Sequence, residues 1–183
     1  MTSEDSQRFP PALVWLKNGI SAVLRPLALT DGEALGEFYE NVPRLDRRHY
    51  CPHLLDRQHG IANAAKALSP LEVVLVLALP EHQIGGYAWY RWPAADAEKS
   101  GFGICISRAC QGQGAGRILM TQLLEIAKTV GPPVMHLTVQ LANARAVKLY
   151  QEMGFTVVRE QMSGAHCYGF PPEPEYAMER RVR

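Results

Sequence analysis

A glycine-rich stretch in the middle of the chain carries the clearest chemical signal. Three glycines fall within five residues of the segment Gln111, Gly112, Gln113, Gly114, Ala115, Gly116 and Arg117. Glycine lets the backbone approach a ligand closely, and the first turn of a helix offers free N–H groups at the positive end of the helix dipole. The segment therefore predicts a cradle for phosphate or pyrophosphate, with an ordinary tight turn between a strand and a helix as the alternative.

Two familiar phosphate-binding motifs do not fit this stretch. A dinucleotide-binding fold expects an acidic residue about 20 positions downstream to hold the ribose, but the following strand, residues 134–140, contains no Asp or Glu. A Walker loop requires a Gly-Lys pair, and the chain contains none. The glycine pattern therefore indicates a different class of anion-binding protein.

The elements that must position this loop follow from the hydrophobic pattern. Leu119, Leu123 and Ile126 recur at helical spacing, and Gly131 follows the helix that they define. The second half of the chain predicts, in order, a strand over 102–107, a helix over 115–130, a strand over 134–139, a helix over 143–153 with Asn143 as its N-cap, and strands over 155–159 and 176–182.

The first half predicts mostly antiparallel strands. An Asn-Gly pair between the apolar segments 13–16 and 20–25 indicates a hairpin, so residues 1–19 are expected to form an N-terminal extension with an extra strand. The β-branched run over 71–79 predicts a strand buried on both faces, and its neighbour follows over 83–92. Helices are expected between Thr30 and Pro43 and between Leu54 and Leu68. The predicted fold class is α/β (α+β), with a mixed sheet.

Length and charge limit the functional classes. The 183 residues fit a single domain over 1–183, and 19 Lys plus Arg against 18 Asp plus Glu argue against a nucleic-acid partner. The apolar run over 73–79 is far shorter than the roughly 20 residues of a membrane span. The acidic N-terminus is unlike a secretory signal, which favours the cytoplasm. The four cysteines lack C-x-x-C spacing and are expected to be free thiols: Cys51, Cys105, Cys110 and Cys167.

Two motifs together resemble the GNAT superfamily of acyl-CoA-dependent N-acyltransferases. The loop from Gln111 to Gly116 resembles the family signature Q/R-x-x-G-x-G/A, and the segment from Asn143 to Phe155 resembles N-x-x-A-x-x-L-Y-x-x-x-G-F. The best-matched stretch is 102–158. The resemblance implies a GNAT-like fold whose βαβαβ C-terminal half has splayed central strands. The sequence departs from the family at Arg108, where a proline is usual, and at Cys110, where an aromatic residue is common.

The resemblance also implies acetyl-CoA as co-substrate and assigns roles to residues. The backbone amides of residues 112–117, in the loop that begins at Gln111, would receive the pyrophosphate. The backbone of Ile104, Cys105 and Ile106 would pair with the pantetheine arm like an added half-strand, and Asn143 would lie beside the arm. Tyr150 would face the thioester sulfur as general acid, whereas helix spacing alone favours a core tyrosine.

The sequence offers no evident proton acceptor for an amine. Some relatives place a glutamate on the strands that flank the cleft, but residues 102–107 and 134–140 contain no acid. His136 lies on the second of these strands and is expected to be a satisfied core histidine. Proton transfer through water and desolvation of the amine are the remaining alternatives.

The amine acceptor is expected between residues 38–58 and 161–175, by similarity to relatives. The basic residues around the first segment are Arg44, Arg47, Arg48, His49, His53, Arg57 and His59. They form either a solvated helix face or a rim that attracts an acidic acceptor. A zinc site at His49 and His53 is not expected, because Pro52 interrupts the helix it would need, so no metal is predicted. On the hairpin side, the residues expected to line the site are His166, Cys167 and Tyr168.

Two functional classes follow from these observations. The first is an N-acetyltransferase acting on a primary amine, which is a protein N-terminus, a lysine or a small molecule. The alternative is a non-catalytic acyl-CoA-binding sensor or regulatory protein of the same fold. In either class we expect a monomer or homodimer without a nucleic-acid or membrane partner.

Overall fold

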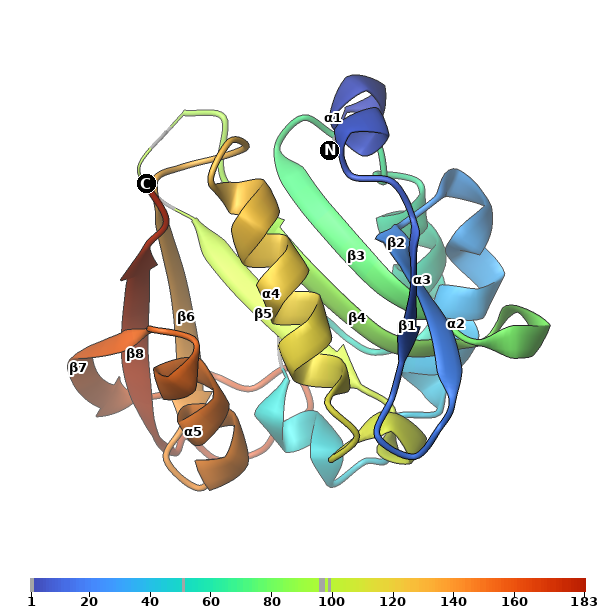
Figure 1. The fold of residues 1–183 in the computed structure, drawn as a ribbon. Helices are drawn as coiled ribbons and strands as arrows, with labels where there is room; N and C mark the ends of the chain where they lie inside the picture. The colour runs from blue at the N-terminus through green and yellow to red at the C-terminus, as the bar shows by residue number, and fades with distance from the viewer. Residues whose placement is uncertain (1, 51, 96–97, 99) are drawn as a thin grey trace.

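The computed structural model describes residues 2–50, 52–95, 98 and 100–183 (Figure 1). Its helices and strands are α1 Ser3–Arg8, β1 Ala12–Trp15, β2 Ser21–Pro26, α2 Gly32–Glu40, α3 Arg57–Ala64, β3 Glu72–Ala78, β4 Ile84–Arg91, β5 Gly101–Ile106, α4 Ala115–Ala127, β6 Val134–Gln140, α5 Ala144–Glu152, β7 Thr156–Met162 and β8 Pro174–Arg181. Two short 3-10 turns matter for the site, η2 at Asp46–His49 and η4 at Arg108–Cys110. Within the described ranges, no helix is both long and apolar enough to cross a membrane.

Five antiparallel strands form the first sheet, in the order β1-β2-β3-β4-β5 (Figure 1). The hairpin predicted at Asn18 and Gly19 is confirmed, since β1 pairs with β2. β3 is buried from Glu72 to Leu77, which confirms the prediction of a strand covered on both faces. The segment before β1 also contains the short helix α1, which the hydrophobic pattern did not predict.

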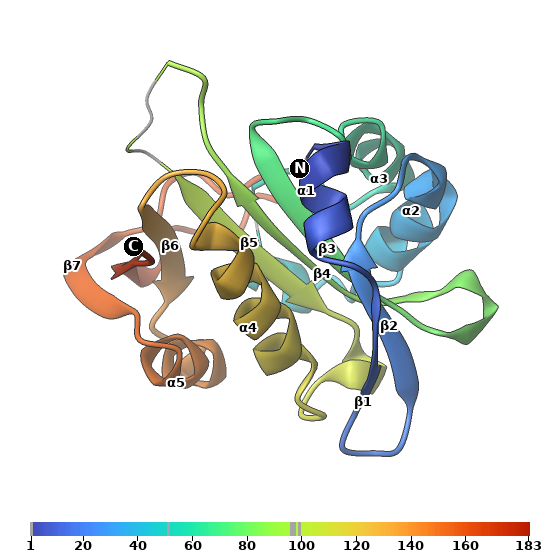
Figure 2. The same ribbon diagram turned by 45° about the horizontal axis from the view of Figure 1, so that its top comes forward.

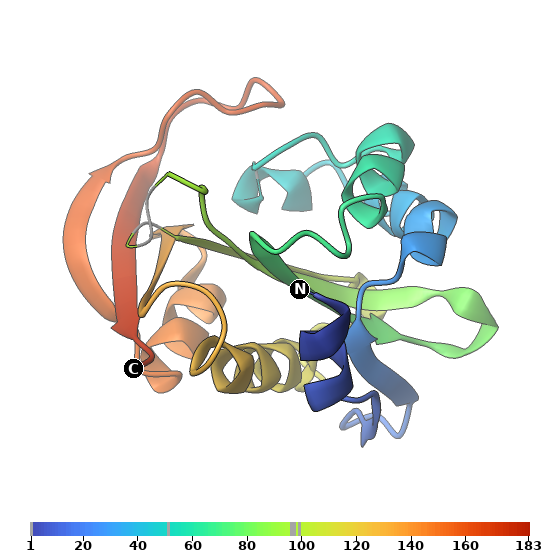
Figure 3. The same ribbon diagram turned by 90° about the horizontal axis from the view of Figure 1, so that it is seen from above.

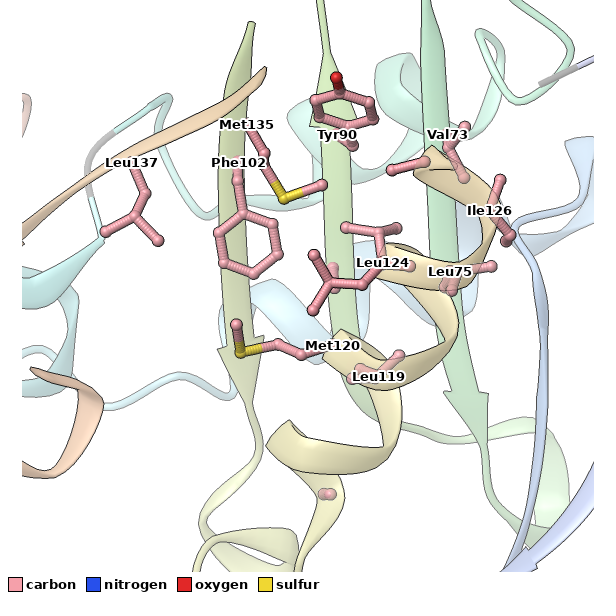
Figure 4. Close-up of a cluster of buried hydrophobic side chains, with 14 of the residues drawn as sticks. Val73, Leu75, Tyr90, Phe102, Leu119, Met120, Leu124, Ile126, Met135 and Leu137 are labelled. Carbon is pink, nitrogen blue, oxygen red and sulfur yellow. The ribbon is translucent and has the colours of Figure 1, made fainter. Parts of the chain in front are cut away.

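Alternate side chains of β3 divide between two hydrophobic cores. Val73 and Leu75 pack with Leu119 of α4 on one face of the sheet (Figure 4). Val74 and Val76 belong to the core under α2 and α3 on the other face. Figure 3 shows α4 on one side of the sheet and α2 and α3 on the opposite side. The period of two along the strand therefore explains how one apolar run supports both layers.

Three further strands form a second sheet in the order β6-β8-β7, again with antiparallel pairing. β5, α4 and β6 form a crossover in which β5 and β6 run in the same direction (Figure 2). These two strands belong to different sheets, so the described part of the chain contains no hydrogen-bonded parallel pair. The mixed α/β class with splayed central strands is confirmed, and the splay divides the predicted single sheet into two.

Candidate active site

One cleft gathers nearly all of the residues predicted to bind a ligand. It has a volume of about 680 Å³, and β5, the start of α4, the end of β6 and α5 contribute to its walls, facing residues of α2 and η2. The predicted residues that line it are Ile104, Cys105, Ile106, Gln111, Gly112, Gly114, Ala115, Gly116, Arg117, Asn143 and Tyr150. Gln113 does not belong to the described lining, because the loop turns its backbone carbonyl toward Lys17, whose N–H donates to it at 3.0 Å.

Gly112 and Gly114 give the loop before α4 its shape. Their φ angles are +76° and +89°, in the left-handed region that favours glycine. Gly114 is the N-cap of α4, so the N–H groups of the first helical turn have no acceptor inside the helix. No hydrogen bond among the described residues uses the N–H of Gly112 or Gly114. The loop therefore offers several backbone donors at the positive end of the helix, an arrangement that suits a pyrophosphate.

Basic side chains surround the same end of the cleft. Lys17, Arg145 and Lys148 line it together with Arg117, whose guanidinium pairs with Glu152. Lys17 comes from the turn of the β1–β2 hairpin, which reaches the loop before α4 (Figure 2). No sequence motif pointed to Lys17, Arg145 or Lys148 as binding residues. The available signal was the spacing of three between Arg145 and Lys148, which places both on one helix face.

The second edge of β5 can pair with an extended ligand. One edge pairs with β4, where Ile104 lies opposite Ala88. No described strand pairs with the other edge, and Ile104, Cys105 and Ile106 face the cleft. The Gln111 side chain donates to the Ile106 carbonyl at 3.1 Å, so a ligand that uses this carbonyl must displace the amide. The geometry is that of a strand edge open to β-augmentation.

Asn143 and Tyr150 are placed by α5. The side chain of Asn143 accepts a hydrogen bond from the Ala146 N–H at 3.3 Å, which confirms the predicted N-cap. Tyr150 is 7% exposed, and its ring packs edge-on against Phe102 with centroids 5.9 Å apart. Tyr150 lines the cleft, and no hydrogen bond within the described residues uses its hydroxyl. The O–H group is therefore available to a ligand.

The surroundings of Tyr150 disfavour negative charge. Burial, and then the nearby Cys105, raise the pKa of Tyr150 well above its usual value, so the phenol stays neutral at physiological pH. Burial, with Asp46 as the next cause, raises the pKa of the Cys105 thiol to about 12. A thiolate released in this part of the cleft would be disfavoured in the same way. A neutral tyrosine O–H beside such a thiolate is a group that can donate a proton to the sulfur.

The opposite wall of the cleft combines apolar and titratable residues. Phe38 of α2 and Val42 after it contribute apolar surface, and Asp46 and His49 of η2 contribute polar groups. Tyr50 follows η2, and its hydroxyl accepts a hydrogen bond from the indole N–H of Trp89 at 2.8 Å. This wall lies within the segment predicted to bind the acceptor.

The arginines proposed as a rim for an acidic acceptor make internal contacts. Arg47 donates to the carbonyl oxygens of Val42 at 2.8 Å and Glu40 at 3.0 Å. Arg48 pairs with Glu173 at 2.6 Å. Neither arginine belongs to the described lining of the cleft. The structure therefore supports a role in holding η2 rather than in attracting an acid.

The loop between β7 and β8 packs against the segment around η2. The Tyr168 hydroxyl accepts from the Leu55 N–H, and the guanidinium of Arg47 lies 5.3 Å from the centroid of its ring. The Nε2 of His166 donates to the Arg48 carbonyl at 3.1 Å. These residues support the wall from behind, and the prediction that they line the site is wrong for the described cleft.

The cysteines do not all behave as predicted. Cys105 and Cys110 are free thiols, as expected. Cys167 is disulfide-bonded, so the expectation of a free thiol is wrong for it. A disulfide depends on which sulfurs the fold brings together, and spacing along the chain does not reveal this. The corresponding expectation for Cys51 lies outside the described residues.

His136 does not belong to the cleft. The buried positions of β6 are Met135, Leu137 and Val139, so His136 points to the other face. Its side chain is 41% exposed and lies 3.5 Å from Glu179, which corrects the prediction of a core histidine. No group of three or more His, Cys, Asp or Glu within the described residues could hold a metal ion.

Comparison with known protein families identifies the family of this chain. The profile of the Acetyltransferase (GNAT) family matches residues 33–155, which is more than half of the 183 residues. The chain therefore belongs to the GNAT acetyltransferase family.

Two curated relatives match parts of the chain. The mycothiol acetyltransferase of Jonesia denitrificans is 30% identical over 81 residues, which cover 44% of this chain and 26% of that protein. The L-methionine sulfoximine/L-methionine sulfone acetyltransferase of Salmonella typhimurium is 33% identical over 57 residues, which cover 31% of this chain and 33% of that protein. The matched region thus spans a third or less of each relative.

Solved structures share the fold over most of its length. The structure of yncA from Salmonella typhimurium with acetyl-CoA has a TM-score of 0.72 and 22% identity, and the match covers 88% of this chain and 94% of that one. The phosphinothricin acetyltransferase of Sinorhizobium meliloti, solved with AcCoA, has a TM-score of 0.69 and 18% identity over 87% and 88% of the two chains. At these identities the similarity establishes the fold.

Proposed function

We propose that the protein is an N-acetyltransferase that transfers the acetyl group of acetyl-CoA to a primary amine in a ternary complex. The observation that carries the proposal is that the glycine loop, the free edge of β5 and Tyr150 line one cleft together with the wall formed by α2 and η2. Two substrates held in one space gain rate through proximity and orientation. The acetyl-CoA-bound structural neighbours and the named acetyltransferases support acetyl-CoA as the donor.

In this proposal each part of the cleft has a task. The amides of the loop before α4 hold the pyrophosphate, with Lys17, Arg145 and Lys148 adding positive charge. The edge of β5 aligns the pantetheine arm, and Asn143 lies beside it. The amine nitrogen attacks the thioester carbon, the carbon–sulfur bond breaks, and Tyr150 donates its proton to the departing sulfur. The tyrosinate recovers a proton from the new amide nitrogen, so the residue is regenerated.

Thiol release during steady-state turnover tests this proposal. The acceptors are L-methionine sulfone, phosphinothricin, a peptide with N-terminal alanine and N-α-acetyl-lysine. Tyr150→Phe should lower kcat by about 100-fold or more, because a general acid typically contributes 10²–10⁴-fold. Its affinity for acetyl-CoA should stay within about twofold, because the phenol lies outside the predicted phosphate cradle. Tyr176→Phe, on β8 and outside the described cleft lining, is the matched control.

The outcomes separate the two functional classes. Binding of acetyl-CoA without turnover of any acceptor would favour the non-catalytic sensor. Full activity in Tyr150→Phe would remove the general acid from the mechanism. The identity of the amine, a cytoplasmic location and a monomeric or homodimeric state stay predictions from the sequence.

A further inference from the structure

An amine that binds as an ammonium ion must lose a proton before it can attack. The wall formed by α2 and η2 contains side chains that could accept this proton. Glu37, Asp46 and His49 line the cleft from this wall. All three lie outside the strands that flank the cleft, where the sequence offers no acid. The proton acceptor is therefore sought among these three groups.

Asp46 already forms an ion pair with Arg108. Its two carboxylate oxygens accept from Arg108 at 2.9 and 3.0 Å. The Arg108 hydrogen bond lowers the pKa of Asp46 against the opposing effect of burial, which makes this carboxylate a weaker base. Glu37 of α2 and His49 are both exposed residues, so exposure does not separate them. An ordinary imidazole is about 100-fold more basic than an ordinary glutamate, so histidine is the better match for an ammonium ion.

The backbone that carries His49 is fixed from several directions. The carbonyl of Arg48 accepts from Gln140 at 2.9 Å and from His166 at 3.1 Å. The neighbouring Arg47 is held by backbone carbonyls at the end of α2. Gln140 ends β6, so its bond ties η2 to the strand on the far side of the cleft. These bonds fix the backbone next to His49, which limits how far η2 must move when the amine arrives.

Burial and the neighbouring charges together favour the neutral form of the His49 ring. Burial and the guanidinium of Arg48 lower the pKa of His49, whereas Gln140, Glu173 and Asp46 act in the opposite direction. The lowered pKa favours the neutral imidazole, which is the form that can accept a proton.

We infer that His49 is the proton acceptor for the amine, a role that rests on the proposed acetyltransferase function. The imidazole takes one proton from the bound ammonium ion and later releases it to solvent. The neutral amine then attacks the thioester, and Tyr150 and the nitrogen exchange the second proton as described above. One ammonium ion and one acetyl-CoA thus give one amide, one free thiol and one proton.

The pH dependence of kcat/KM from pH 5 to 9 tests the role of His49. His49→Gln should lower kcat at pH 7 by about 100-fold, with acetyl-CoA affinity within about twofold of the parent chain. The part of the acid limb that reflects His49 should be lost, so that kcat/KM of the variant instead rises with pH toward the pKa of the amine. The loss of activity in His49→Gln should become smaller as the pH rises toward the pKa of the amine, because solvent then deprotonates more of the amine. His49→Asn repeats the measurement with a shorter side chain, and melting curves verify that both variants fold.

Two control variants make the result specific. His136→Gln removes the exposed histidine on β6 and should leave the profile unchanged. Glu37→Gln removes the competing carboxylate, and a larger loss there than in His49→Gln would overturn the assignment. Parent-level activity and an intact acid limb in both His49 variants would overturn it as well while leaving the acetyltransferase function in place. Absence of turnover in the parent chain would instead reject the proposed function and, with it, this role.

Discussion

Gly114 and Gly169 form a matched pair for measuring what the loop before α4 contributes to binding. Both have a left-handed backbone, with φ of +89° and +73°, and at both a Cβ would meet nothing within 4 Å. Alanine at either position should cost roughly 1–2 kcal/mol, which lowers Tm by about 2 to 8 °C. Only Gly114 lines the cleft. Only Gly114→Ala should therefore also weaken acetyl-CoA binding, by about tenfold.

Calorimetric titration with acetyl-CoA, together with melting curves, would check this prediction. The equal strain in the two variants removes general destabilisation as an explanation. Unchanged affinity in Gly114→Ala would mean that the co-substrate does not depend on the left-handed turn at the start of α4.

The cleft residues divide according to whether a local motif carries them. Asn143 and the glycine loop could be predicted because capping and left-handed turns leave a local pattern in the sequence. Lys17 could not be predicted, since it reaches the cleft only because a distant hairpin docks against the loop. The sequence pointed to His49 only as one of the basic residues around the expected acceptor segment; its place in the cleft could not be predicted, because η2 is held by contacts of Gln140 and His166 with the Arg48 carbonyl.

At the scale of elements, Arg108 and Asp46 connect the two walls of the cleft. Arg108 lies in η4, just before the glycine loop that precedes α4, and Asp46 begins η2. Their side chains are 63% and 30% exposed, so the pair contributes little to the overall stability. The pair links the loop that follows β5 to the wall that carries His49. The usual family proline at position 108 could not make this bridge.

Arg108→Gln should therefore affect the reaction with the amine more than the stability of the fold. We expect Tm to stay nearly unchanged and kcat/KM for the amine to fall about three- to tenfold, with acetyl-CoA affinity within about twofold. Lys128→Gln removes an ion pair of similar exposure with Glu125 on the α4 side and is the control. The difference in kcat/KM between the parent chain and Arg108→Gln should become smaller at about 1 M salt, where ion pairs are screened. An equal loss of kcat/KM in Arg108→Gln and Lys128→Gln would contradict a specific role of the Arg108–Asp46 pair.

The elements themselves were predictable where their hydrophobic pattern is strong. β3 and α4 appear where the apolar run and the helical spacing place them, although α4 ends at Ala127 rather than 130. The order β6-β8-β7 was not predictable in detail, because the last strand inserts between two earlier ones through long-range pairing. The sequence pattern specifies the faces of a strand but not its neighbours.

At the scale of the whole molecule, the cleft exists because the two sheets separate between β5 and β6. Each side contributes a different part of the predicted donor site: β5 and α4 supply the strand edge and the loop amides, and β6 and α5 supply Asn143 and Tyr150. A ligand that fills the cleft therefore contacts both sheets. Binding should stabilise their relative position as well as the residues that it touches.

Acetyl-CoA should accordingly stabilise the whole fold. At a concentration of 100 times Kd, binding contributes about 2.7 kcal/mol, which for a chain of this size raises Tm by roughly 5 to 11 °C. Hydrogen exchange should slow at the amides of residues 104–106, 112 and 114–117, which line the cleft, while the exposed edge strand β7 serves as the internal control. A rise in Tm without protection at residues 112 and 114–117 would place the ligand elsewhere. Absence of any rise would reject both the acetyltransferase and the acyl-CoA sensor, because each requires the folded cleft to bind this molecule.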